Sequence, residues 1–189
     1  MKLTGQGHWV WAGAAAVLSA APVQVVVASD FLSLEAAQQS LYPAADHFTE
    51  VALGLTPAQR ERVAALAGPQ PPHRSLRAFR ALKGGEFLGY VFVDEVIGKE
   101  DFITYAAAID AAGRLGTLEV MSYRESHGGE IRNAAWRRQF AGRDRLDELT
   151  VSADIKNIAG ATLSCEHVTQ GVRWLMALWQ VALRPVAAG

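Results

Sequence analysis

Four stretches between residues 75 and 123 have the composition of β-strands, and short turns join them. The alternation is clearest in residues 86–97, where the side chains divide between two faces. One face carries Leu88, Tyr90, Phe92 and Asp94, and the other carries Phe87, Val91 and Val93. We expect strands at residues 76–82, 86–97, 102–109 and 115–123. Because such short turns join antiparallel neighbours, the sequence predicts an antiparallel β-meander.

Helical patterns lie on both sides of these strands. Ser33 is placed to cap a short helix that ends at Leu41, and Thr56 followed by Pro57 predicts a second helix that Gly68 ends. A short helix around residues 136–140 is expected before the last one. The final helix is long and amphipathic, with Ser164 as its expected N-cap and an apolar stripe formed by Val168, Val172, Leu175, Met176, Trp179 and Leu183. The predicted fold is therefore α+β: an antiparallel sheet packed with short N-terminal helices and a long C-terminal helix.

The N-terminal segment has the features of an export signal. Residues 9–28 contain no charged side chain, and Lys2 is the only basic residue before them. Small residues at Val26 and Ala28 favour cleavage after Ala28, although a run of this length could also remain as a membrane anchor. We therefore divide the chain into a signal peptide or anchor (1–28) and one domain (29–189). The expected location is the periplasmic or extracytoplasmic side of the cell membrane.

Composition and motifs exclude several functions. The net charge of −1 and the lack of a basic stripe argue against nucleic-acid binding, and Cys165 has no second cysteine with which to form an internal disulfide. No phosphate-binding loop, dinucleotide motif or Gly-x-Ser-x-Gly elbow is present. Glu125, His127 and Glu130 do not have the spacing of a metal site, so we predict none. No catalytic residues are assigned.

The segment Gly160-Ala161-Thr162-Leu163-Ser164 lies just before the final helix. A helix N-terminus presents free amides and favours negative charge, and the small residues allow a large group to approach the backbone. Thr162 could therefore carry a phosphate-containing group. The same residues are also typical of an ordinary turn with a helix cap.

Four features resemble the FMN-binding domain family, which includes flavin-carrying subunits of the sodium-pumping quinone reductase and of the Rnf complex. Residues 41–45 are similar to the family's Phe-Pro-x-Ala segment, and residues 89–93 with the turn at 110–113 are similar to its central strands. Glu125-Ser126-His127-Gly128 stands where the family has Glu-Thr-Pro-Gly. Residues 159–164 are similar to the signature Ser/Thr-Gly-Ala-Thr-x-Ser/Thr.

The resemblance implies FMN as cofactor, esterified through its phosphate to Thr162 by a flavin transferase. It implies a binding site formed by Gly160, Ala161, Thr162, Leu163, Ser164, Glu125, Ser126 and Gly128. The implied function is electron transfer between membrane-bound donors and acceptors, and a stand-alone enzyme is disfavoured because the chain has no nicotinamide site. Lys156 and Ala159 depart from the family pattern, which commonly has an acid and Ser or Thr there. The alternative is a flavin-free binding or regulatory domain that keeps the fold.

Overall fold

The computed structural model describes residues 32–184. The expected signal peptide or anchor at residues 1–28 lies outside this range. No helix within residues 32–184 has the length and apolar character needed to cross a membrane.

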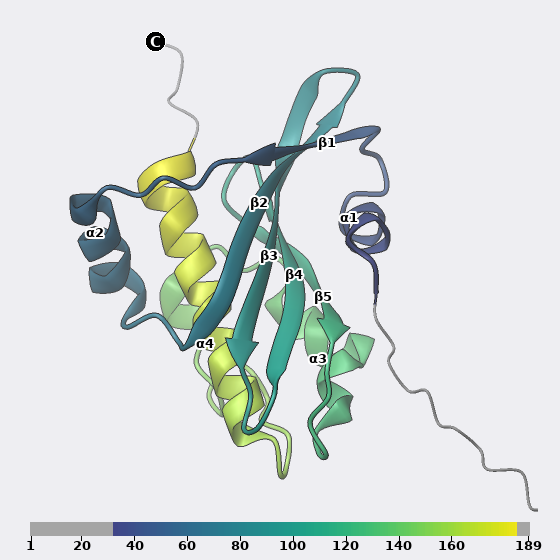
Figure 1. The fold of residues 1–189 in the computed structure, drawn as a ribbon, viewed down its shortest axis with the longest axis vertical. Helices are drawn as coiled ribbons and strands as arrows, with labels where there is room; N and C mark the ends of the chain where they lie inside the picture. Colours follow the sequence, from purple (N-terminus) through teal and green to yellow (C-terminus); the bar gives the residue numbers. More distant parts are fainter. Residues whose placement is uncertain (1–31, 185–189) are drawn as a thin grey trace, which may run out of the picture.

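A five-stranded antiparallel sheet forms the centre of the domain, and its strands are ordered as they occur in the chain (Figure 1). The strands are β1 (His47–Val51), β2 (His73–Lys83), β3 (Glu86–Ile97), β4 (Phe102–Asp110) and β5 (Leu115–Ser122). The predicted meander and the predicted bounds of β3 are confirmed. The sequence analysis missed β1, which pairs with β2 at the sheet edge and is only five residues long. None of its residues is fully buried, so it lacks the hydrophobic alternation by which strands are recognised.

The predicted faces of β3 are confirmed for Tyr90 and Phe92 on one side and Val91 and Val93 on the other, but the prediction is wrong at Phe87. Ala81 pairs with Gly89 while Leu82 pairs with Phe87, so Leu88 is an extra residue in β3. This bulge reverses the alternation, and Phe87 packs beside Tyr90 with ring centroids 4.9 Å apart. The expectation that Phe87 shares a face with Val91 and Val93 is wrong for this reason.

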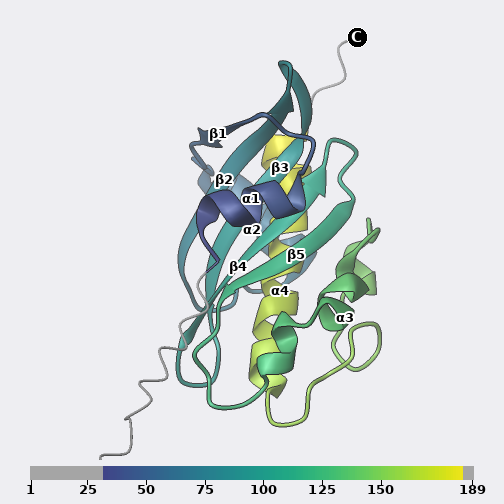
Figure 2. The same cartoon turned by 90° about the vertical axis from the view of Figure 1, so that its right-hand side faces the viewer.

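Helix α1 (Leu34–Leu41) covers one face of the sheet (Figure 2). The Ser33 hydroxyl accepts a hydrogen bond from the Ala36 amide at 3.1 Å, which confirms the predicted cap. Ala37 and Leu41 of the helix pack against a small apolar cluster on the sheet, formed by Phe79, Val91, Val93, Ala106, Ala108 and Met121. Burial of these apolar side chains holds α1 in place.

Helices α2 (Pro57–Ala67) and α4 (Thr162–Leu178) lie on the opposite face, so the sheet is the middle layer of three (Figure 1). Thr56 and Gln59 form a reciprocal capping box at the start of α2. The buried stripe of α4 completes the main core, and a π-helical turn (Trp179–Leu183) follows it. At Gly171 a Cβ atom would lie 2.3 Å from the Tyr105 hydroxyl oxygen, so α4 lies directly on β4. The α+β prediction is confirmed.

Short helical turns connect β5 to α4. They are the 3-10 turns Gly129–Arg132, Arg138–Phe140 and Leu146–Glu148, with the single α-helical turn α3 (Ala134–Arg137) among them. Trp136 and Phe140 are both buried, with ring centroids 5.1 Å apart, where the sequence predicts a short helix. Their burial fixes this connection against the edge of the sheet.

Candidate functional site

Three segments that are distant in the sequence enclose a cavity of about 280 Å³, here called the Thr162 cavity. They are the turn between β3 and β4, the loop after β5, and the residues at the start of α4. The lining residues are Lys99, Glu100, Glu125, Ser126, His127, Gly160, Ala161, Thr162, Leu163 and Ser164. Seven of the eight residues predicted to bind the cofactor are among them, and the eighth, Gly128, lies directly behind the wall. Whether each of them contacts a cofactor stays a prediction.

Thr162 is the first residue of α4, and its side chain is exposed to solvent. The Asn157 side-chain amide donates a hydrogen bond to Thr162 Oγ1 at 3.0 Å, which holds the hydroxyl while leaving its proton available. Amides in the first turn of a helix have no acceptor within the helix, so they are available to an anion. The site therefore combines an accessible hydroxyl with an environment that favours a phosphate.

The predicted N-cap, Ser164, is wrong. Helix α4 begins two residues earlier, and Ala161 occupies the cap position without a side-chain hydrogen bond. Ser164 is only 2% exposed, and its hydroxyl lies within hydrogen-bond distance of the Tyr123 hydroxyl oxygen, at 3.4 Å. A local rule cannot recognise this because the Ser164 hydroxyl contacts Tyr123, which follows β5 and is distant in the sequence. Thr162 consequently lies in the first turn of the helix and not ahead of it.

The loop after β5 packs tightly on the start of α4. Gly128 has φ +83°, and a Cβ atom there would lie 2.0 Å from the Ala161 Cβ and 2.7 Å from the Tyr123 hydroxyl oxygen. Tyr123 also donates a hydrogen bond to the His127 carbonyl. Only glycine allows this approach, because it tolerates a left-handed backbone and has no side chain. Gly128 therefore shapes the cavity through its contact with Ala161.

Glu125 supports the turn between β3 and β4. Its Oε1 atom accepts hydrogen bonds from the amides of Glu100 at 2.8 Å and Asp101 at 3.0 Å. Burial raises the pKa of Glu125, but the backbone hydrogen bonds and the nearby Lys99 charge more than offset it, so the pKa lies below its usual value. Glu125 therefore joins two walls of the cavity as an anion.

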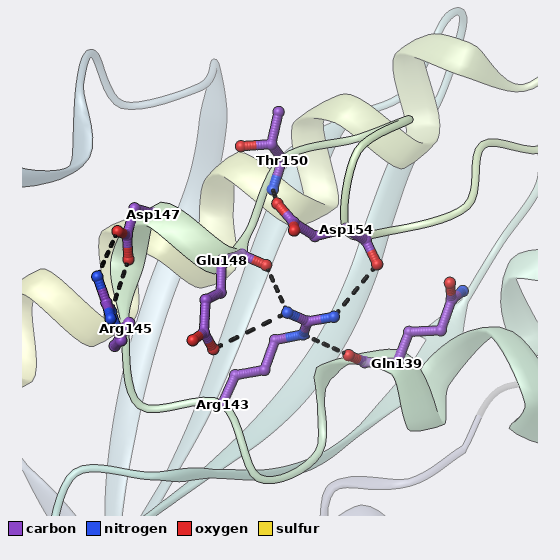
Figure 3. Close-up of polar contacts among 7 residues, drawn as sticks. All are labelled: Gln139, Arg143, Arg145, Asp147, Glu148, Thr150 and Asp154. Carbon is purple, nitrogen blue, oxygen red and sulfur yellow. Dashed lines mark hydrogen bonds and ion pairs between the residues drawn. The ribbon is translucent and has the colours of Figure 1, made fainter.

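Arg143 organises the segment that leads to Thr162 (Figure 3). Its guanidinium donates to the carbonyls of Gln139 at 2.7 Å, Glu148 at 2.8 Å and Asp154 at 3.2 Å. The Asp154 carboxylate accepts from the Thr150 amide at 3.2 Å within the same turn. Asp154 therefore stabilises its own turn and does not line the Thr162 cavity.

Lys156, where the family commonly has an acid, also lies outside the Thr162 cavity. Its amide donates to the Gln139 side chain at 2.8 Å, and its carbonyl accepts from the Trp136 indole at 2.8 Å. Its exposed side chain lines a separate cavity beside Trp136 and Ile158. Lys156 therefore places no charge in the wall around the Thr162 hydroxyl.

Sequence reasoning missed four residues that form or support the cavity: Lys99, Glu100, Tyr123 and Asn157. Asn157 could have been found, because it is a polar residue in the turn that precedes Thr162. Lys99 and Glu100 carry no such signal, because only the packing of the β3–β4 turn brings them to this site. Their side chains form an exposed ion pair at 3.6 Å, so Lys99 remains accessible to a solvated anion.

The cavity has properties that suit a phosphate-linked flavin. Its volume is slightly below the range of about 300–1,000 Å³ that encloses drug-sized ligands, so FMN would extend beyond it. The first-turn amides of α4 and the Lys99 ammonium supply donors for a phosphate. The residues present therefore fit an FMN group attached at Thr162.

The fold and the site together define an α+β domain that presents an accessible threonine at a helix N-terminus. The family model described as the FMN-binding domain matches residues 98–176, a range that contains all three cavity segments. No curated protein matches the chain. Residues 98–176 therefore match the FMN-binding domain family, and this match indicates FMN as the cofactor.

Proposed function

We propose that this protein is an exported flavoprotein that carries FMN as a phosphoester on Thr162. It transfers electrons between membrane-bound redox partners. The observation that carries this proposal is the position of Thr162: its exposed hydroxyl lies at the N-terminus of α4, in the wall of a cavity within the family match.

The attachment requires a flavin transferase as partner. The Thr162 hydroxyl displaces AMP from FAD, forms the bond between Oγ1 and the FMN phosphorus, and loses its proton. Asn157 favours this step because its hydrogen bond at 3.0 Å restricts the orientation of the hydroxyl. The exposure of Thr162 allows the transferase to reach it.

The protein's remaining contribution is to hold and orient the cofactor, while the flavin supplies the redox chemistry. The α4 N-terminus favours the phosphate, and the small side chain of Ala161 leaves room beside it. The loop 125–128 forms the opposite wall and is the expected neighbour of the isoalloxazine ring. Because the cavity is smaller than the cofactor, an edge of the ring stays accessible for electron transfer.

Intact mass of the denatured protein tests the proposal. Co-expression with a periplasmic flavin transferase is expected to add the mass of one FMN group, and Thr162→Ala is expected to abolish this increment. Thr162→Ser is the matched control, because it retains a hydroxyl at the same position. The same spectrum gives the mature N-terminus and so distinguishes a cleaved signal from an anchor. An unmodified, colourless wild-type protein would contradict the proposal and favour the flavin-free alternative.

A further inference from the structure

A second cavity, here called the Arg173 cavity, shares no lining residue with the Thr162 cavity. It lies between the end of α2, one side of α4 and residues 149–151, and its volume is about 520 Å³. This volume is within the range of about 300–1,000 Å³ that is typical of small-molecule sites. Ala67, Pro69, Leu149 and Val151 contribute apolar walls.

Two polar side chains in the wall of this cavity have atoms without a hydrogen-bond partner. Among residues 32–184, four buried side-chain nitrogen or oxygen atoms lack a partner, and Thr169 Oγ1 and Arg173 Nε are two of them. Thr169 is only 2% exposed. Because the two residues are four apart on α4, their side chains project from the same face in successive turns. Buried polar groups are normally paired, so this face has a hydrogen-bonding capacity that the chain itself does not use.

We propose that the Arg173 cavity binds a small organic carboxylate with an apolar body. The planar guanidinium matches the geometry of a carboxylate and forms charge-assisted hydrogen bonds with it. The Thr169 hydroxyl supplies a further donor beside it. The apolar walls enclose the remainder of the ligand, which gains from removal of apolar surface from water. This site is independent of flavin attachment.

Two carboxylates lie near the Arg173 guanidinium, those of Asp147 and Glu166, and Asp147 already pairs with Arg145 at 2.7 Å. Gln170 donates hydrogen bonds to the Ala67 carbonyl at 2.6 Å and the Pro69 carbonyl at 3.1 Å, so these oxygens at the end of α2 are already paired. Glu166 is exposed and precedes Arg173 by seven residues, or roughly 10 Å along the helix axis. A direct charge-assisted hydrogen bond outweighs a solvated charge at that distance.

His167 contributes its ring to the wall between Glu166 and Thr169. Its Nδ1 lies 2.6 Å from the Ile97 carbonyl, a contact in which the ring nitrogen must be the donor. This bond fixes the ring against the end of β3, next to the turn that lines the Thr162 cavity. The two cavities therefore adjoin through Ile97 and α4 without sharing a wall residue.

Titration of the isotope-labelled full chain with sodium benzoate, followed by amide chemical shifts, tests this site. Saturable shifts are expected at lining residues such as Thr169 and Arg173, with a dissociation constant in the millimolar range or tighter. Benzyl alcohol, which has the same ring without the charge, is expected to bind at least tenfold more weakly. The protein is made without a transferase, so the outcome does not depend on modification of Thr162.

Variants separate a binding role from a structural one. Arg173→Gln is expected to weaken benzoate binding roughly ten- to a hundredfold, and Thr169→Val about fivefold. Thr169→Val should leave the midpoint of denaturant unfolding unchanged or higher, because the hydroxyl has no partner in the free protein. Glu166→Gln is the control from the same wall and should not weaken binding. Non-saturable shifts, equal binding of benzyl alcohol, or unchanged affinity in Arg173→Gln would each overturn the proposal.

Discussion

Substitution of Gly128 by alanine should loosen the contact between the loop after β5 and the start of α4. The new Cβ would lie 2.0 Å from the Ala161 Cβ and 2.7 Å from the Tyr123 hydroxyl oxygen, and neither contact can be accommodated without movement. The left-handed backbone, at φ +83°, adds a strain of about 1–2 kcal/mol for a residue with a side chain. Overpacking adds roughly 1–3 kcal/mol. The expected loss in the free energy of unfolding is therefore about 2–5 kcal/mol.

Gly142→Ala provides the matched control. Gly142 has nearly the same backbone conformation, φ +81°, but a Cβ atom there would have nothing within 4 Å. Its substitution should cost only the backbone strain of about 1–2 kcal/mol. Urea unfolding of both variants measures the two losses, and their difference reports the packing of Gly128 alone.

A double-mutant cycle locates the contact more directly. Ala161→Gly removes the nearest atom, so it should restore part of the stability lost in Gly128→Ala, with a coupling of about 0.5–3 kcal/mol. The reasoning is refuted if Gly128→Ala loses no more stability than Gly142→Ala. It is also refuted if Ala161→Gly restores nothing in the Gly128→Ala background.

Two further variants test the walls of the Thr162 cavity. Asn157→Ala removes the hydrogen bond to the Thr162 hydroxyl, which is worth about 1 kcal/mol. FMN incorporation by the transferase, followed by mass over time, should therefore slow about fivefold. An unchanged rate would contradict the role of Asn157. Glu125→Gln should destabilise the fold by roughly 1 kcal/mol at neutral pH, because the amides of Glu100 and Asp101 then lose a charged acceptor. The pKa of Glu125 is lowered in the folded protein, so its stabilising charge is fully present above the unfolded pKa of 4.5 and is lost as the pH falls through the folded pKa. Urea unfolding at several pH values should therefore show the wild type and Glu125→Gln converging in acid, and a constant difference would refute this account.

Most elements of the fold could be predicted because their signals are local. The period of two in residues 86–97 gave the correct bounds of β3, and side chains next to the helix starts gave the caps at Ser33 and Thr56. The errors arose where a distant contact overrides a local rule. Phe87 changes face because β3 bulges against β2, and Ser164 is not the cap because α4 begins at Thr162, with Ser164 packed against Tyr123.

The candidate site could be predicted only in part. The resemblance placed Thr162 and loop 125–128 in one site, and the structure brings both to a single cavity. Lys99 and Glu100 could not be placed there, since they belong to a turn whose position depends on the twist and register of two strands. The structure also shows Glu125 bonded to the amides of that turn, where the sequence suggested only a neighbour of the flavin.

The sequence by itself determined the order of the elements, the α+β class and the threonine beside a helix N-terminus, because periodicity, capping and turn residues act over a few positions of chain. Only the tertiary structure decided what surrounds that threonine. Gly128 packs against Ala161, and Glu125 accepts hydrogen bonds from the β3–β4 turn. Arg173 lines a separate cavity. All three arrangements depend on contacts between residues that are far apart in the chain. Such contacts depend on strand register and on the close packing of α4 against the sheet, which no short stretch of sequence specifies.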